Sequence, residues 1–168
     1  MSNNPLYAPW RMDYIRSIDK PEASACFLCD AANATTSEDR KSRLVLWTTE
    51  HMVVLINRYP YTSGHLLIAP RAHKPELADL TDAEQADLIR QTTRAIRVLK
   101  DAMSPQGFNL GINLGRPAGA GVPSHLHQHA VPRWNGDTNF MTVVGATRVL
   151  PEELPQSAVR LREMFARG

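Results

Sequence analysis

The chain has 168 residues, of which 43% are hydrophobic and 21% charged, and its formal net charge is +2. This length fits one compact domain with its own core, and the composition is that of an ordinary globular protein. The near-neutral charge argues against general attachment to nucleic acid, and no apolar stretch is long enough to cross a bilayer. Because the sequence also lacks a signal-peptide pattern, we expect a cytoplasmic protein with no membrane or nucleic-acid partner.

The first half of the chain predicts an extension, a loop and three strands. Residues 1–25 combine three prolines with several aromatic residues and are expected to pack on the domain as an N-terminal extension. Residues 30–41 are small and polar, which predicts a surface loop. Runs rich in Val, Leu and Ile, separated by turn residues, predict strands at residues 43–48, 52–57 and 65–70.

The second half predicts a long central helix between further strands. Thr81 and Glu84 form a capping-box pattern, and apolar residues then recur at helical spacing to about Met103. Further strands are predicted at residues 108–113, 125–132 and 142–145, and an amphipathic C-terminal helix at 151–167. Strands and helices do not alternate regularly, so we predict an α+β fold with a mainly antiparallel sheet, as one domain over residues 1–168.

Three histidines alternate in the predicted strand at residues 125–132, namely His125, His127 and His129. Side chains two residues apart lie on the same face of a strand, so we expect the three imidazoles to lie together. An imidazole can act as a nucleophile, an acid, a base or a metal ligand. A solvated surface strand and a metal site made of these three histidines are the alternatives to a catalytic site. We favour a functional site, because three imidazoles on one face need polar partners or ligands.

A glycine-rich loop, residues 113–121, directly precedes this strand. Glycine allows backbone N–H groups to approach an anion closely, so the loop is a candidate phosphate cradle. A phosphate held beside a nucleophilic imidazole indicates attack on phosphorus. The alternative is that the loop is only a flexible connection.

Several segments resemble the histidine-triad (HIT) family. Residues 125–131 resemble its His-x-His-x-His motif followed by two apolar residues. Residues 57–70, which contain the pair Gly64-His65, resemble the upstream strand–loop–strand of the family. Residues 132–141 resemble the bacterial branch related to diadenosine tetraphosphate phosphorylases, and so do residues 6–15 and 147–151. The resemblance covers nearly the whole chain.

The resemblance implies a HIT-like fold, with a five-stranded antiparallel sheet, a long central helix and a C-terminal helix, paired into a homodimer. It also implies a nucleotide-binding enzyme that cleaves dinucleoside polyphosphates such as diadenosine tetraphosphate. In that activity His127 attacks the α-phosphate and forms a nucleotidyl-histidine intermediate. Either phosphate or water then accepts the nucleotidyl group, and the sequence does not choose between a phosphorylase and a hydrolase.

The resemblance also assigns the residues around His127. His129 and His65 would bind phosphate oxygens and stabilise the charge that develops there. Asn113 would touch the phosphates and Asn57 the ribose. Backbone donors would come from Gly119, Ala120 and Gly121. Gln128 faces away from the triad and is expected to be structural.

One departure from the family bears on the substrate. Family hydrolases often carry Ser or Gln in the loop before the triad, where this chain has Ala120-Gly121-Val122. A polyphosphate is a good leaving group that needs little help, so a dinucleoside polyphosphate is favoured over a nucleoside phosphoramidate. A phosphoramidate hydrolase, and a nucleotide-binding or interaction module with little turnover, remain the alternatives.

Cys26 and Cys29 are the only cysteines, and their spacing is that of half a zinc site. Some HIT proteins and the related uridylyltransferases complete such a pair with histidines at the positions of His73 and His125. The resemblance therefore implies a structural Cys₂His₂ zinc site in which His125 holds metal while His127 does chemistry. Two buried cysteines packed as small hydrophobic residues, a redox pair, and His51 as a replacement ligand are the alternatives.

Overall fold

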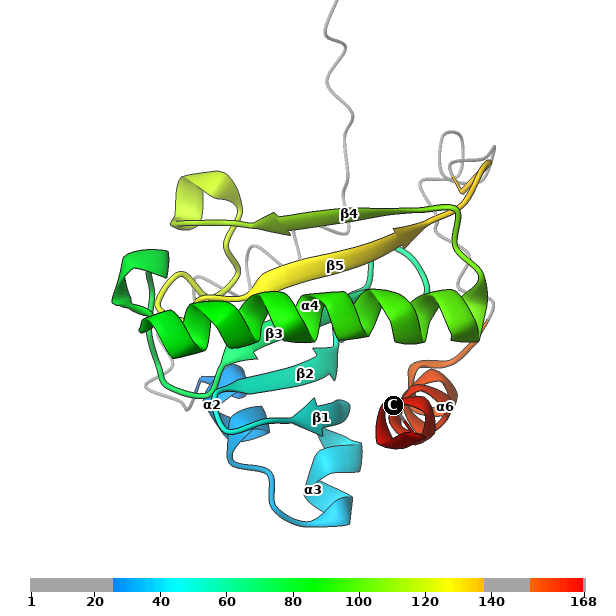
Figure 1. Cartoon of the computed structure of the whole chain (residues 1–168), viewed down its shortest axis with the longest axis horizontal. Helices are drawn as coiled ribbons and strands as arrows, with labels where there is room; N and C mark the ends of the chain where they lie inside the picture. Colours follow the sequence, from blue (N-terminus) through cyan, green and yellow to red (C-terminus); the bar gives the residue numbers. More distant parts are fainter. Residues whose placement is uncertain (1–25, 138–151, 168) are drawn as a thin grey trace, which may run out of the picture.

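The computed structural model describes residues 26–137 and 152–167. Its strands form one antiparallel five-stranded sheet in the order β1-β2-β3-β5-β4 (Figure 1). They are β1 (Val45–Thr48), β2 (Met52–Ile56), β3 (Leu66–Pro70), β4 (Gly107–Ile112) and β5 (Gln128–Arg133). The predicted α+β fold with a five-stranded antiparallel sheet is confirmed.

The helices are α2 (Phe27–Ala32), α3 (Ser37–Ser42), α4 (Asp82–Met103) and α6 (Leu154–Arg167), with 3-10 turns η1 (Leu77–Asp79) and η2 (Arg116–Ala118). The predicted capping box starts α4: the Thr81 side chain accepts from the Glu84 N–H, and the Glu84 carboxylate accepts from the Thr81 N–H. The helix ends at Ser104, whose φ of 49° is left-handed. The long central helix therefore lies where the sequence predicts it.

Apolar side chains are buried on both faces of the sheet. Along β2, Met52, Val54 and Ile56 pack into the larger core, which also contains side chains of α4 and α6. The alternate residues Val53 and Leu55 pack into a smaller core with α2. Figure 1 shows α4 crossing one face of the sheet, with α2 and α3 near the β1 and β2 end. Burial on both faces explains why the inner strands read as continuous apolar runs.

The loop predicted at residues 30–41 is wrong, because the end of α2 and all of α3 except Ser42 fall within it. The Thr36 side chain caps α3 by accepting a hydrogen bond from the Asp39 N–H at 3.1 Å. Acidic residues occupy the first turn of α3 and basic residues its last turn, which suits the helix dipole. Capping, charge and the helix formers Glu38, Arg40 and Lys41 thus make a short helix within this polar segment.

The histidine strand was predicted to begin at residue 125, but β5 begins at Gln128. The cause lies in its neighbour β3, which pairs with β5 only from Leu66 to Ile68 and ends at Pro70. The N–H of Leu126 instead donates to the Lys74 carbonyl at 2.7 Å. His125 and His127 therefore lie in the connection that leads into the strand, and only His129 lies within the strand.

Some predictions fall outside the described residues: the packing of residues 1–25, the strand at 142–145, and the segments 6–15 and 147–151. Within the part of the chain that the structure describes, no helix is both long and apolar enough to cross a membrane.

Candidate functional site

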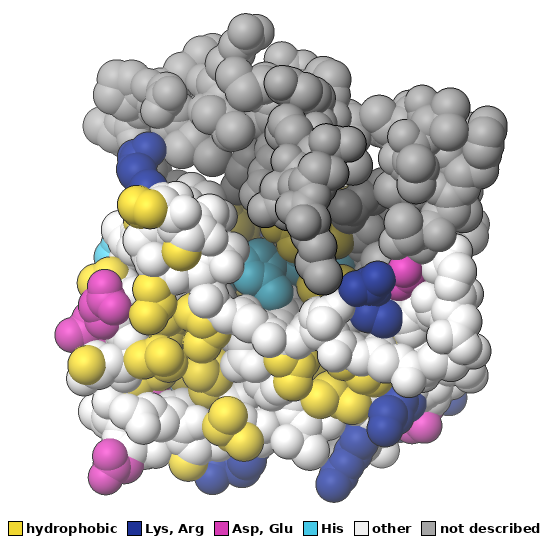
Figure 2. Space-filling view, turned by 90° about the horizontal axis from the view of Figure 1, so that it is seen from above, with side chains coloured by type: hydrophobic (Ala, Val, Ile, Leu, Met, Phe, Trp, Pro, Cys, Tyr) yellow, Lys and Arg dark blue, Asp and Glu magenta, His cyan; other side chains and the backbone are white. Residues whose placement is uncertain are grey.

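Three histidines from separate points in the chain meet at the start of β5. His65 directly precedes β3, His127 directly precedes β5 and His129 lies in β5. The ring of His129 lies 5.2 Å from that of His127 and 5.1 Å from that of His65, measured between centroids. His65 is fully buried and His127 nearly so. Figure 2 shows histidine side chains reaching the middle of the face seen from above, with hydrophobic side chains on both sides.

A backbone carbonyl fixes the protonation of His127. Its Nδ1 lies 2.8 Å from the carbonyl oxygen of His125. A carbonyl oxygen can only accept, so Nδ1 carries the proton and Nε2 carries a lone pair. Burial lowers the pKa of His127, although the same hydrogen bond opposes the shift. His127 is therefore neutral near pH 7 and has a lone pair on Nε2, as a nucleophilic imidazole requires.

A chain of hydrogen bonds fixes the proton of His129 on Nε2, the opposite ring nitrogen from that of His127. The backbone N–H of Tyr61 donates to Nδ1 of His65 at 3.1 Å, so the His65 proton is on Nε2. That Nε2–H donates to Nδ1 of His129 at 2.9 Å, so His129 holds its proton on Nε2. Burial, helped by the nearby His127, lowers the pKa of His129 to about 4. A neutral ring with its N–H on Nε2 thus lies beside the ring of His127, at a centroid distance of 5.2 Å.

Asn57 organises the loop between β2 and β3. Its side-chain oxygen accepts from the Tyr59 N–H at 3.0 Å, and its Nδ2 lies 3.4 Å from Nδ1 of His65. Its backbone N–H donates to the carbonyl of His65. Asn57 therefore holds the segment that positions His65, and its predicted contact with a ribose stays a prediction.

The glycine-rich loop is closed by its own hydrogen bonds. The Gly119 N–H donates to the Arg116 carbonyl at 2.9 Å and the Ala120 N–H to the Gly115 carbonyl at 3.3 Å. The side chain of Asn113 lies 3.4 Å from the Gly119 carbonyl. Gly119 has a φ of 91°, where a Cβ would be strained. Phosphate contacts from Asn113, Gly119, Ala120 and Gly121 stay predictions, and two of these amides would first have to release their present acceptors.

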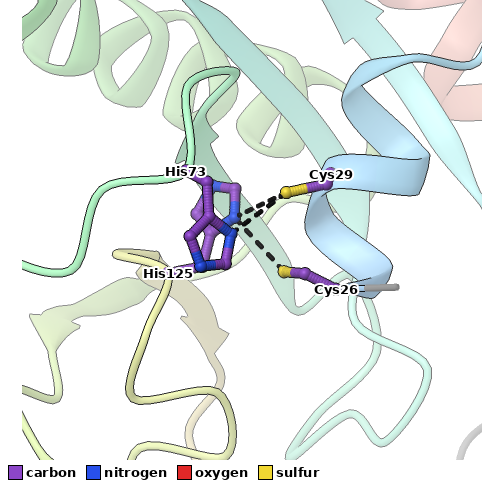
Figure 3. A group of neighbouring side chains, drawn as sticks. All are labelled: Cys26, Cys29, His73 and His125. Carbon is purple, nitrogen blue, oxygen red and sulfur yellow. Dashed lines mark hydrogen bonds between the residues drawn. The ribbon is translucent and has the colours of Figure 1, made fainter. Parts of the chain in front are cut away.

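The structure brings the four predicted metal ligands together (Figure 3). Cys26 and Cys29 lie at the start of α2, His73 follows β3, and His125 precedes β5. Nδ1 of His125 lies 3.3 Å from Sγ of Cys26 and 3.4 Å from Sγ of Cys29, and Nδ1 of His73 lies 3.1 Å from Sγ of Cys29. All four ligand atoms lie within 4.8 Å of one another, and His51 is outside the group.

The chemistry of this cluster fits a divalent metal ion. The Nε2–H of His125 donates to the Pro70 carbonyl at 2.8 Å, which leaves the lone pair of Nδ1 facing the two sulfurs. Ligands of a tetrahedral zinc lie about 3.5 Å apart, close to the distances found here. Burial, followed by the influence of Cys26, raises the pKa of Cys29 to about 11. A cation between the sulfurs would favour the thiolates that burial disfavours.

Two contacts near the histidines were not predicted from the sequence. The Thr92 hydroxyl on α4 lies 3.2 Å from Oε1 of Gln128, which ties the strand between His127 and His129 to the helix. The ring of Tyr61 lies over His65 and His129, at centroid distances of 4.8 and 6.1 Å. Tyr61 falls within the segment 57–70 that resembles the HIT family, but its aromatic character alone did not distinguish it.

Comparison with known proteins agrees with this geometry. The HIT domain family matches residues 38–136. AP-4-A phosphorylase of Mycobacterium tuberculosis is 39% identical over 165 residues, covering 96% of this chain and 84% of that protein. The asymmetrical bis(5'-nucleosyl)-tetraphosphatase of Schizosaccharomyces pombe is 34% identical over 93 residues, covering 55% of this chain and 50% of the relative.

A solved structure of similar fold is a zinc-bound histidine triad family protein from Mycobacterium smegmatis. The two chains superpose with a TM-score of 0.65 at 26% identity, over 85% of this chain and 94% of the other. Sequence and fold therefore agree, and this chain belongs to the HIT domain family.

Proposed function

We propose that this protein cleaves dinucleoside polyphosphates by transferring a nucleotidyl group to His127. The observation that carries the proposal is the pairing of a lone pair on His127 Nε2 with an N–H donor on His129, each fixed by hydrogen bonds. The relatives named AP-4-A phosphorylase and bis(5'-nucleosyl)-tetraphosphatase support a substrate of this class.

In the first step, His127 Nε2 attacks the α-phosphorus and forms an N–P bond, while the P–O bond to the rest of the polyphosphate breaks. The Nε2–H of His129 stabilises the charge on the phosphate oxygens. His65, which the sequence also predicts to bind phosphate, uses its single N–H to donate to His129 and so orients that donor instead. In the second step, an oxygen of phosphate or water attacks the same phosphorus and breaks the N–P bond. Diadenosine tetraphosphate would release ATP first, and then ADP if phosphate accepts or AMP if water accepts.

The test is incubation with diadenosine tetraphosphate, with and without inorganic phosphate, followed by identification of the products. His127→Ala should lower turnover by at least about 10³-fold and leave nucleotide binding largely intact. His51→Ala, which removes a histidine outside the site, should keep full activity. Substrate labelled at the α-phosphate should also leave label on wild-type protein after alkaline quenching, because the N–P bond survives alkali. Activity retained in His127→Ala would refute the proposal.

We infer that Cys26, Cys29, His73 and His125 hold a structural zinc ion. The four ligand atoms and the lone pair of His125 Nδ1 support this assignment. The bound ion would stabilise the cluster and fix the segment that carries His127. Protein purified without chelator should contain about one zinc per chain, and Cys26→Ser should contain much less. Wild-type protein free of metal would contradict the assignment.

We further propose that the protein is a homodimer paired through the side that carries β4. This strand is at the edge of the sheet and exposes Leu110 at 45%, while α4 exposes Ile89 at 62%. Among the described strands none pairs with the outer edge of β4, and such an edge with apolar side chains favours pairing with another chain. Leu110→Asp should therefore halve the mass measured by light scattering, whereas Val159→Asp, on the exposed surface of α6, should not. A monomeric wild-type protein would overturn this proposal.

A further inference from the structure

Tyr61 lies against the hydrogen-bonded pair His65 and His129. Its ring is 4.8 Å from that of His65 and 6.1 Å from that of His129, where the two planes differ by only 21°. The tyrosine is 42% exposed, whereas His65 is fully buried and His129 is partly buried. The aromatic ring therefore covers part of the histidine pair against solvent.

The main chain of Tyr61 contacts His65. Its N–H donates to Nδ1 of His65 at 3.1 Å, shorter than the 3.4 Å from Asn57 Nδ2 to the same atom, and this donor sets the proton positions along the chain from His65 to His129. With its proton on Nδ1 instead, His65 would accept from His129 rather than donate to it. The proton of His129 would move to Nδ1, and its Nε2 would become an acceptor unsuited to a phosphate oxygen.

The loop that carries Tyr61 is held firmly in place. The Thr62 hydroxyl donates to the Pro132 carbonyl at 2.8 Å, next to the end of β5. Gly64 has a φ of 74°, and a Cβ at this position would lie 2.7 Å from Sδ of Met103. A loop fixed in this way can hold a ring and an amide at constant positions, as positioning of a catalytic group requires.

We propose that Tyr61 is a positioning residue, whose ring shields His65 and His129 and whose amide keeps the proton of His129 on Nε2, directed at the phosphate. This inference rests on the proposed function for the identity of the ligand, but not for the state of the histidines. Among the described residues, His65, His127 and Tyr61 are the titratable groups whose rings pack against His129. The low pKa of His129 agrees with a shielded, neutral donor.

The experiment compares Tyr61→Ala with Tyr61→Phe. Imidazole ¹⁵N shifts, assigned with His129→Asn, report without substrate which nitrogen carries the proton and at what pH each ring titrates. Wild type and both variants keep the amide of residue 61, so His129 should carry its proton on Nε2 in all three, and a proton on Nδ1 would overturn the role of the amide. Tyr61→Ala should raise the titration midpoint of His129 toward its ordinary value near 6.5 and lower kcat about tenfold, with a smaller change in KM. Tyr61→Phe, which keeps the ring, should behave like wild type in both measurements.

The outcomes separate this inference from the proposed function. An unchanged His129 titration in Tyr61→Ala would overturn the shielding role, even if the protein cleaves dinucleoside polyphosphates. Equal damage from Tyr61→Phe would overturn it as well, because the hydroxyl rather than the ring would then be responsible. A shifted midpoint in a protein that cleaves no such substrate would support the positioning role and contradict only the proposed function.

Discussion

The candidate metal cluster and the histidines proposed to face phosphate (His65, His127 and His129, the phosphate-facing site) hold their imidazoles in different ways. In the cluster, the Pro70 carbonyl accepts the Nε2–H of His125, so the lone pair of Nδ1 faces the sulfurs. At the phosphate-facing site, the His125 carbonyl accepts the Nδ1–H of His127, so the lone pair is on Nε2. The position of one backbone acceptor therefore separates the candidate metal ligand from the proposed nucleophile.

The two regions meet in residues 125–127. His125 contributes its side chain to the cluster and its carbonyl to His127, while the intervening Leu126 N–H is held by the Lys74 carbonyl, one residue after His73. A change in the cluster should therefore affect the nucleophile. The phosphate-facing side depends instead on packing of the loop between β2 and β3, so the two regions should respond differently to metal removal and to core substitution.

Metal removal should have the largest effect. When the free metal concentration is about 1,000 times the Kd, binding adds about 4 kcal/mol to the free energy of unfolding. Chelation should therefore lower Tm by about 10 °C. Cys29→Ser should begin at the lower Tm and respond little to chelator. His51→Ala should respond as wild type does, because His51 lies outside the cluster. A wild-type Tm that chelator leaves unchanged would show that the cluster does not depend on metal.

Gly64→Ala tests the packing on which the phosphate-facing side depends. The new Cβ would be strained at a φ of 74° and would lie 2.7 Å from Met103 and 3.0 Å from Leu99. We expect a loss of about 3 kcal/mol in the free energy of unfolding, measured by urea denaturation. The matched control is Gly136→Ala, whose φ is 78° but whose Cβ meets nothing within 4 Å. It should lose only about 1 kcal/mol, and equal losses would mean that crowding at Gly64 is unimportant.

The main strands and helices, and the first candidate residues of both regions, could be predicted from local patterns. The apolar runs of the strands, the capping box of α4, the alternation of the histidines and the spacing of Cys26 and Cys29 are short-range signals. The metal cluster joins residues 44 to 99 positions apart, and the resemblance to a family was needed to connect them. The protonation of each imidazole and the role of Tyr61 could not be predicted, because they depend on carbonyls and amides that only the folded chain brings near.

Acid should lower the free energy of unfolding through protonation of His129. The pKa of His129 is about 4 in the folded state, below its ordinary value near 6.5, so the unfolded chain binds more protons between these two values. Stability contributed by neutral His129 is complete above pH 6.5 and is lost as the pH falls toward 4. The slope from this one group is at most about 1.4 kcal/mol per pH unit. Urea denaturation of His129→Asn should show a shallower slope in this range than wild type, and parallel slopes would contradict the assignment.

The smallest effect should come from the contact that holds β5 against α4. The hydroxyls of Thr92 and Thr93 both donate to carbonyls one turn earlier, at 2.7 and 2.9 Å, but only that of Thr92 also lies close to Gln128. Thr92→Val leaves the buried Gln128 amide without this partner and should cost about 1–2 kcal/mol in the free energy of unfolding. Thr93→Val removes an equivalent hydroxyl at the exposed surface and should change stability by less than about 0.5 kcal/mol.

Because Gln128 lies between His127 and His129, Thr92→Val should also lower kcat modestly without changing zinc content. A loss of zinc in Thr92→Val would mean that α4 supports both regions rather than the histidine strand alone.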